Sequence, residues 1–235
     1  MNKPPKVLCS ICVRRGSQGL PNKNMLPLAG IPLFAHSIQT ALKSKVFEQV
    51  VVSTDCEEMM QIAKEFGASV LFKRPAELAT AESSKIPVIR HAFLAAEEHF
   101  GQRYDISVDL DATSPLRIVD DIKDSLSYFI QEDFDNLITG CKARRSPYFN
   151  LVERKPDGRI ATVMDTDYRI KRRQNSPECF DLNASIYIWK RDVLVENDKL
   201  FLQRTGFFEM PEERSFDIDS ELDFLIVEAI YKDRT

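Results

Sequence analysis

The sequence lacks a long hydrophobic run, and no apolar stretch approaches the roughly 20 residues needed to cross a membrane. It also shows no signal peptide, because Arg14 and Arg15 interrupt the apolar stretch near the N-terminus and no small-residue cleavage pattern follows. We therefore expect a protein of the cytoplasm that has no membrane partner.

Cysteine is scarce and irregularly spaced. The chain has 5 cysteines, and an odd, scattered set argues against a disulfide framework. Cys9 and Cys12 form a C-x-x-C pair, but they lie in an apolar strand, where positions three apart face opposite sides. No second pair completes a four-thiolate zinc site. We expect buried strand cysteines rather than a redox or metal motif.

Basic residues are not in excess. The chain has 32 Lys and Arg against 36 Asp and Glu, a formal net charge of -4, which disfavours nucleic acid as a partner. Anionic small molecules remain suitable ligands, because a local basic cluster can dominate a cleft. With 235 residues, of which 43% are hydrophobic, residues 1–235 suit a single domain with a sizeable core.

Short apolar runs alternate with helical patterns over the first 140 residues. Strands are predicted at 7–13, 49–53, 69–72, 106–110 and 136–140. Helices are predicted at 32–43, 57–66, 84–99 and 119–130. This alternation predicts an α/β fold with a doubly wound, mostly parallel sheet, which binds ligands beyond the carboxyl ends of its strands.

The alternation of strand and helix patterns ends at about residue 142. Alternating residues on both sides of Asp157-Gly158 predict a β-hairpin, so we expect an inserted hairpin lobe over about 142–175 that is suited to a partner interface. The core resumes with a strand at 184–189. A final helix is predicted at 220–231, with Ser220 as its N-cap and Asp223 at the third helical position.

A basic loop follows the first strand directly. Arg14, Arg15 and Lys23 supply positive charge, Ser17 supplies a hydroxyl, and two glycines let backbone amides approach a ligand closely. This combination suits a triphosphate, although neither the GxxxxGK[ST] nor the GxGxxG spacing is present. A solvated basic turn is the alternative of equal weight.

Acidic pairs occur at two places. Asp109 and Asp111 share a strand face, where a carboxylate can ligate a hard cation or hold a hydroxyl; the alternative is that Asp111 caps the next turn. Asp217 and Asp219 lie on one face of extended chain and can bind Mg²⁺ together with substrate phosphates. The alternative for Asp219 is stabilisation of the helix that follows.

Two further segments are ambiguous on their own. The basic run 171–175 contains Arg173 and Gln174 and can hold a carboxylate, although such runs are usually solvated. Arg74, with Ser83 further along, follows the predicted strand 69–72.

Taken together, these segments resemble the acylneuraminate cytidylyltransferases, also called CMP-sialic acid synthetases. The resemblance spans nearly the whole chain and depends on five blocks in the family's order. The blocks are VRRGSQGLPNKN at 13–24, RPAELA at 74–79, TSPLR at 113–117, RQ at 173–174 with NASIY at 183–187, and DIDSELD at 217–223.

The resemblance implies a nucleotide-diphospho-sugar transferase-like fold, Mg²⁺ as cofactor, and transfer of CMP from CTP to the anomeric hydroxyl of a nonulosonic acid, with release of pyrophosphate. It implies a homodimer that exchanges the hairpin lobe. The implied CTP contacts are Arg14, Ser17, Lys23 and Asn24, with Arg74 and Ser83 near the cytidine. The implied magnesium ligands are Asp217 and Asp219, and the implied sugar contacts are Arg173, Gln174 and Asn183. The catalytic set that we expect is Arg14, Lys23, Asp111 and Asp219.

Two departures from the family pattern bear on substrate and activity. Gln18 replaces a common lysine in the first loop, and the neighbouring Arg15 is positioned to compensate for that charge. Asp111 with Ala112 replaces a common Gln-Pro, so Asp111 could join Asp219 on the metal, as in the related octulosonate enzymes. The alternatives are therefore a legionaminic or pseudaminic acid substrate, an octulosonate or other sugar nucleotidyltransferase, and a catalytically silent CTP-binding dimer.

Overall fold

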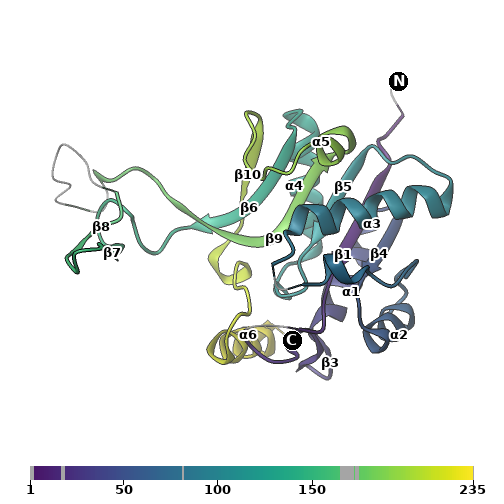
Figure 1. Cartoon of the computed structure of the whole chain (residues 1–235), viewed down its shortest axis with the longest axis horizontal. Helices are drawn as coiled ribbons and strands as arrows, with labels where there is room; N and C mark the ends of the chain where they lie inside the picture. The colour runs from purple at the N-terminus through teal and green to yellow at the C-terminus, as the bar shows by residue number, and fades with distance from the viewer. Residues whose placement is uncertain (1–2, 17–18, 81, 165–171, 173–174, 235) are drawn as a thin grey trace.

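The computed structural model describes residues 3–16, 19–80, 82–164, 172 and 175–234. Its centre is one sheet built from β1 (Val7–Cys12), β4 (Gln49–Ser53), β5 (Ile106–Leu110), β6 (Asn136–Lys142), β9 (Phe180–Lys190) and β10 (Thr205–Glu209). The strand order is β10-β6-β9-β5-β1-β4 (Figure 1). Neighbouring strands are parallel except where β9 pairs with β5 and β6. The predicted mostly parallel sheet is confirmed.

Helices cover both faces of this sheet. The core on one face contains residues from α1 (Leu33–Ser44), α2 (Glu57–Glu65) and α4 (Val119–Gln131). The core on the other face contains residues from α3 (Lys85–Phe100) and α5 (Arg191–Glu196). Cys9 packs into the first core and Cys12 against the second, as strand alternation predicts. All five cysteines are free thiols, and burial together with Asp109 raises the pKa of both strand cysteines.

Three details differ from the prediction. The strand predicted at 69–72 is wrong: only Ser69 makes a parallel bridge, to Val51, before the chain leaves the edge of the sheet. The edge strand β10 and the short helix α5 were missed, because neither is long enough to display a clear period. The strand predicted at 184–189 begins earlier, at Phe180, and continues the ladder with β6 as far as Lys142.

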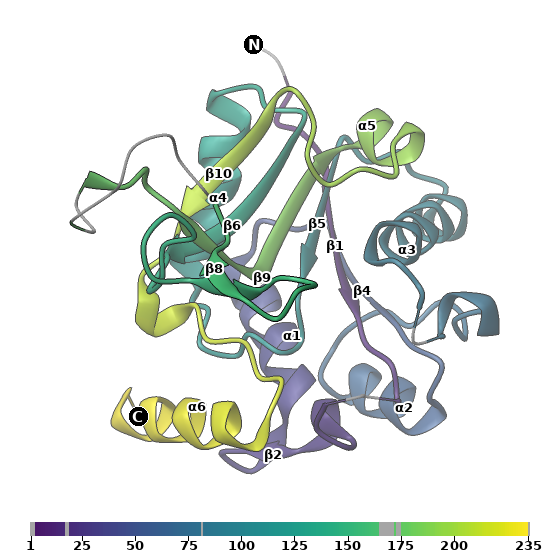
Figure 2. The same ribbon diagram turned by 60° about the vertical axis from the view of Figure 1, so that its left-hand side comes forward.

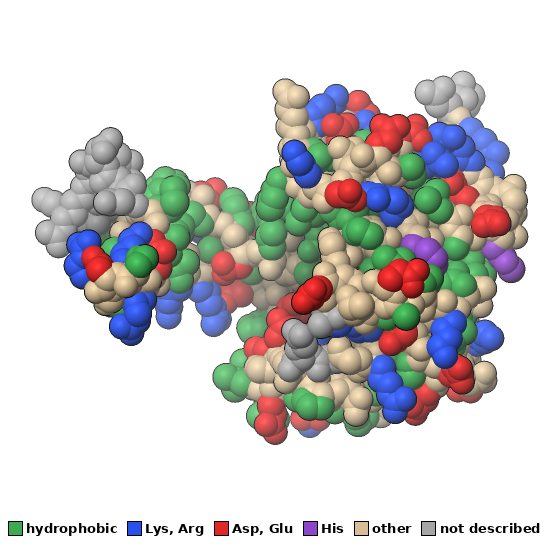
Figure 3. Space-filling model, viewed as in Figure 1, with side chains coloured by type: hydrophobic (Ala, Val, Ile, Leu, Met, Phe, Trp, Pro, Cys, Tyr) green, Lys and Arg blue, Asp and Glu red, His purple; other side chains and the backbone are tan. Residues whose placement is uncertain are grey.

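The extended ends of β6 and β9 carry the hairpin lobe away from the body, where it stands apart in the space-filling view (Figure 3). The lobe contains the antiparallel strands β7 (Val152–Arg154) and β8 (Ile160–Thr162). Between them, Gly158 has a φ of 85° and donates its N–H to Lys155 O at 2.9 Å. The predicted Asp-Gly hairpin is confirmed, with strands shorter than expected.

The last helix, α6 (Glu221–Arg234), lies beside the small sheet of β2 (Pro27–Leu28) and β3 (Ile31–Pro32) (Figure 2). Its Val227 shares a buried cluster with Leu28 and Ile218. The predicted cap is present, because Ser220 N and Oγ both donate to Asp223 Oδ2, at 2.8 and 2.7 Å. This packing brings the 217–219 segment beside the first loop. No described helix is both long and apolar enough to cross a membrane.

Candidate functional site

A cavity of about 410 Å³ opens at the carboxyl ends of β1 and β5, as expected for this sheet. Predicted site residues from four separate segments line it: Arg14, Lys23, Asn24, Arg74, Ser83, Asp111, Asp217 and Asp219. The structure therefore brings together the basic loop, the 74–83 segment and residues of both acidic sites in one pocket.

The remaining predicted residues lie elsewhere. Arg15 is exposed and does not line the pocket, and its backbone N–H donates to Asp55 Oδ1 at 3.2 Å. Asn183 is buried behind the pocket. Four predicted residues lie outside the described part of the chain: Ser17, Gln18, Arg173 and Gln174.

The first loop is fixed at both of its ends. Asn24 Nδ2 donates to the Arg14 carbonyl at 3.1 Å, and the Lys23 ammonium lies 2.8 Å from Asp219 Oδ1. Gly19 approaches the Asp219 carbonyl so closely that a Cβ at this position would clash with it. The glycine is therefore required by the contact between this loop and the segment before α6.

Arg74 and Ser83, which were predicted to lie near the cytidine, are both held by hydrogen bonds within the protein. Arg74 is buried, and its guanidinium donates to Ser53 O at 2.5 Å and to Ser53 Oγ at 3.0 Å. Ser83 Oγ donates to Glu77 O at 3.1 Å and accepts from Thr80 N at 3.2 Å. Both side chains are thus oriented by the protein before any ligand is considered.

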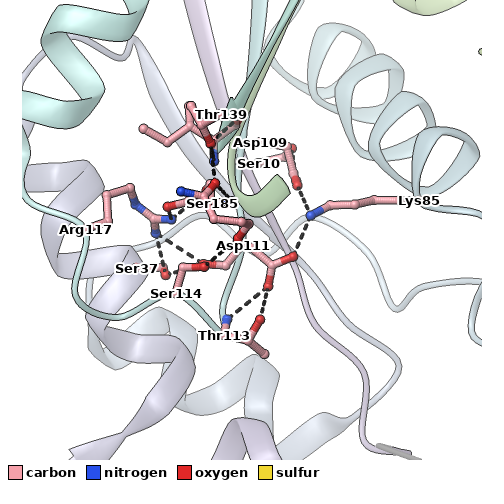
Figure 4. A network of polar contacts seen from close by, with 12 residues as sticks. Ser10, Ser37, Lys85, Asp109, Asp111, Thr113, Ser114, Arg117, Thr139 and Ser185 are labelled. Atoms are coloured by element: carbon pink, nitrogen blue, oxygen red, sulfur yellow. Dashed lines mark hydrogen bonds and ion pairs between the residues drawn. The ribbon is translucent and has the colours of Figure 1, made fainter. Parts of the chain in front are cut away.

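Asp111 follows β5 and is held on both oxygens (Figure 4). Its Oδ1 accepts from the backbone N–H and hydroxyl of Thr113, at 2.9 and 2.7 Å. Its Oδ2 lies 2.5 Å from the ammonium of Lys85. Burial raises the pKa of Asp111, but Lys85 and Thr113 outweigh burial and bring the pKa below its ordinary value. The turn-capping alternative for Asp111 is therefore present, and ligation of a metal by Asp111 stays a prediction.

Lys85 is a pocket residue that the sequence analysis missed. It is the first residue of α3, where the helix dipole disfavours a cation, and that unfavourable placement was the available signal. Burial lowers the pKa of Lys85, but the charges of Asp111 and Asp109 raise it by a larger amount. The pKa of Lys85 therefore lies well above its ordinary value. The lysine therefore remains an ammonium.

Arg117 supports this part of the pocket from behind. Its side chain is buried and donates to Ser185 O at 2.6 Å, to Ser37 Oγ at 2.7 Å and to the Asp111 carbonyl at 3.2 Å (Figure 4). A fork of donors that spans α1, β9 and the loop after β5 fixes the backbone at Asp111. The sequence contained Arg117 in a recognisable motif but gave it no role, because its partners Ser37 and Ser185 lie far away in the chain.

Within the described part of the chain, Asp217 is a pocket carboxylate with one unpaired, buried oxygen. Its Oδ1 is buried and accepts no hydrogen bond from any described residue. Burial, with the charges of Asp111 and Asp219, raises its pKa to about 6. A bound cation would compensate this charge, so the site fits a metal. The described residues nevertheless contain no group of three or more His, Cys, Asp or Glu side chains that could enclose one, so phosphate or water oxygens must complete its coordination.

Asn183 lies in β9 and is almost completely buried. Its Oδ1 accepts from Thr139 Oγ1 at 2.7 Å, and its Nδ2 donates to Ser215 Oγ at 3.0 Å. These contacts join β6 and β9 to the segment that leads to Asp217. The predicted contact with a sugar stays a prediction.

Comparisons with known proteins agree with this arrangement. The profile of a family described as cytidylyltransferase matches residues 9–230. The chain is 48% identical over 225 residues to a CMP-N,N'-diacetyllegionaminic acid synthase of Campylobacter jejuni. The matched region covers 96% of this chain and 94% of the relative. It is 47% identical over 229 residues to post-translational flagellin modification protein B of Campylobacter coli, covering 97% and 96% of the two chains.

Among solved structures, a CMP:2-keto-3-deoxy-manno-octonic acid synthetase in complex with CTP superposes with a TM-score of 0.69. The match covers 98% of this chain and 100% of the other, at 18% sequence identity. At that level of identity, the likeness concerns the fold alone.

Proposed function

The chain belongs to the cytidylyltransferase family, and we propose that it transfers CMP from CTP to the anomeric hydroxyl of a nine-carbon, sialic-type acid sugar. In this reaction the sugar oxygen attacks the α-phosphorus, the bond from that phosphorus to the bridging oxygen breaks, and pyrophosphate leaves. The hydroxyl proton passes to solvent or to a carboxylate of the pocket.

One observation carries the proposal: cationic and anionic side chains from distant segments line a single cavity. Arg14 and Lys23 come from the loop after β1, and Asp217 and Asp219 come from the segment before α6. The cations suit the charge of a triphosphate and of departing pyrophosphate. The carboxylates suit a hard metal ion. Phosphoryl transfer depends mainly on such positioning and charge neutralisation.

We propose that Asp217 and Asp219 hold Mg²⁺ together with the phosphates. When bound there, the ion would polarise the α-phosphate and neutralise developing charge. The exposed carboxylate of Asp219 is free to turn from Lys23 towards an ion, and Asp217 already has a buried oxygen that accepts no hydrogen bond from the described residues. Lys23, once released from Asp219, is then available to a phosphate.

The sugar that we favour is of the legionaminic type. Supporting this, a relative with 48% identity along almost the full chain carries legionaminic acid in its name. Asp111 also supplies a carboxylate where the resembling family commonly has an amide, and the remaining lone pair on its Oδ2 can accept from a sugar N–H or O–H. The octulosonate alternative has only the likeness of fold to support it.

The test is a pyrophosphate-release assay with CTP, Mg²⁺ and separate acceptors. We expect the highest kcat/KM with N,N'-diacetyllegionaminic acid, a lower value with N-acetylneuraminic acid, and little turnover with the octulosonate. A highest value for the octulosonate would favour the alternative enzyme. Tight CTP binding without pyrophosphate release from any acceptor would favour the silent dimer, and the absence of CTP binding would refute both.

We also propose that the chain works as a homodimer through its hairpin lobe. The described part of the lobe exposes apolar side chains: Phe149, Leu151, Val152, Ile160, Val163 and Met164. Such a group on a projecting hairpin is suited to burial against a second copy. The cytoplasmic location stays a prediction.

A further inference from the structure

Lys85 lies where two carboxylates of one strand face converge. Its ammonium is 2.5 Å from Asp111 Oδ2, 3.3 Å from Asp109 Oδ2, and 4.4 Å from the centre of the Tyr187 ring (Figure 4). The roles assigned above to nucleotide, metal and sugar do not use it. The lysine is therefore held in a defined position inside the pocket without a function assigned to it.

The two carboxylates create the need for this cation. Asp109 is fully buried; its Oδ1 accepts from Ser10 Oγ at 2.8 Å, but its Oδ2 accepts no hydrogen bond from any described residue. The other oxygen of Asp111 is occupied by Thr113. Two Oδ2 atoms thus converge on one position, and an uncompensated buried carboxylate there would be strongly unfavourable.

We propose that the Lys85 ammonium is a built-in cation that replaces a second divalent ion between Asp109 and Asp111, so that each chain binds a single divalent ion in the pocket. This inference rests on the proposed function in one respect, because that proposal places the single ion at Asp217 and Asp219. It assigns Lys85 a positioning role, because the lysine orients Asp111 and keeps that carboxylate away from the metal.

Removal of the lysine should turn its position into a metal site. Two convergent carboxylate oxygens beside water are the donors that Mg²⁺ and Mn²⁺ prefer. Lys85→Met keeps most of the side-chain volume and removes the charge. Lys85→Arg keeps the charge, so it should leave the number of bound ions unchanged.

The test counts Mn²⁺ ions bound per chain, from the EPR signal of free Mn²⁺ in titrations without nucleotide. We expect Lys85→Met to bind one more ion than the wild type, and we expect a further Asp111→Asn change in that variant to remove the gain. A matched control is Lys190→Met, because Lys190 also pairs with two carboxylates, Asp133 at 2.6 Å and Asp135 at 3.8 Å, but near the surface. That control should gain no ion.

The proposal is overturned if folded Lys85→Met binds as many ions as the wild type. It is also overturned if Asp111→Asn in the otherwise wild-type chain loses an ion, since Asp111 would then be a metal ligand. The second measurement is decisive even if Lys85→Met fails to fold, which a thermal unfolding curve would reveal. A wild-type chain that releases no pyrophosphate from any acceptor would refute the proposed function and leave the ion counts valid.

Discussion

The ammonium of Lys23 lies 2.8 Å from the carboxylate of Asp219, across 196 positions of the chain. The two side chains differ in exposure: 13% for Lys23 and 76% for Asp219. The lysine is therefore held in place, whereas the carboxylate lies largely in solvent. The backbone of this segment is fixed independently, by the buried Ile218 and by the cap of α6. Asp219 can exchange its partner without disturbing the fold.

Asp219→Ala should separate activity from stability. We expect kcat for pyrophosphate release to fall by about 100-fold or more, because a carboxylate that acts on the reacting phosphates is lost. The thermal unfolding midpoint should change little, because an exposed ion pair contributes on the order of 1 kcal/mol or less.

The matched control is Asp124→Ala, which removes an exposed aspartate of α4 that does not line the pocket. Its kcat should stay near that of the wild type. A rate close to wild type in Asp219→Ala would remove Asp219 from the proposed mechanism.

Asp217 should make stability depend on pH in the metal-free protein. Its folded-state pKa is raised to about 6 from an ordinary 3.8, mainly by burial and then by Asp111. The folded state therefore holds this proton more tightly than the unfolded state. The contribution of Asp217 to the free energy of unfolding is therefore fully present below about pH 4 and is lost as the pH rises through about 6.

Urea unfolding at intervals from pH 4 to 7, with a chelator present, measures this effect. Asp217→Asn should show a smaller loss of stability than the wild type across that window. Asp109 titrates in both proteins, so the difference between the two curves isolates Asp217. Parallel curves would contradict the assigned pKa.

The sequence predicted the sheet, most of its helices and the edge of the sheet where the pocket lies for a physical reason. Parallel strands with intervening helices place their carboxyl ends at one edge, so Arg14 and Asp111 had to meet there. The periodicity of the sequence could not predict that Asp219 lies beside the first loop, because this position depends on how α6 packs against Leu28 and Ile218. The family resemblance supplied that long-range information.

Other features could not be predicted because they depend on tertiary contacts. Lys85 gives only a weak local signal, its unfavourable place at a helix start, until Asp109 and Asp111 are seen beside it. The strand β10 is specified by its pairing with β6, and the close approach of Gly206 to the Phe134 ring leaves no room for a side chain. Local propensity contains neither fact.

Arg117→Met should destabilise the fold strongly. The buried guanidinium donates to Ser185, Ser37 and the Asp111 carbonyl, and methionine would remove all of these charge-assisted hydrogen bonds and leave Ser37 Oγ without a donor. We expect the free energy of unfolding in urea to fall by about 3 kcal/mol. The control is Arg103→Met, whose 2.8 Å ion pair with Asp192 is exposed on both sides and should contribute less than about 1 kcal/mol. Equal losses in the two variants would show that the buried fork has no special role.

Ile160→Arg should separate the proposed dimer into monomers. Ile160 lies on β8 with 57% of its side chain exposed, and a charge at the centre of an apolar contact between two lobes would have to be buried without a partner. Light scattering after size-exclusion chromatography should then report the mass of one chain rather than two. Ile130→Arg is the matched control, because Ile130 is 44% exposed but lies on α4, away from the lobe. If both variants stay dimeric, the dimer forms through another surface; if the wild type is already monomeric, the lobe does not hold two chains together in solution.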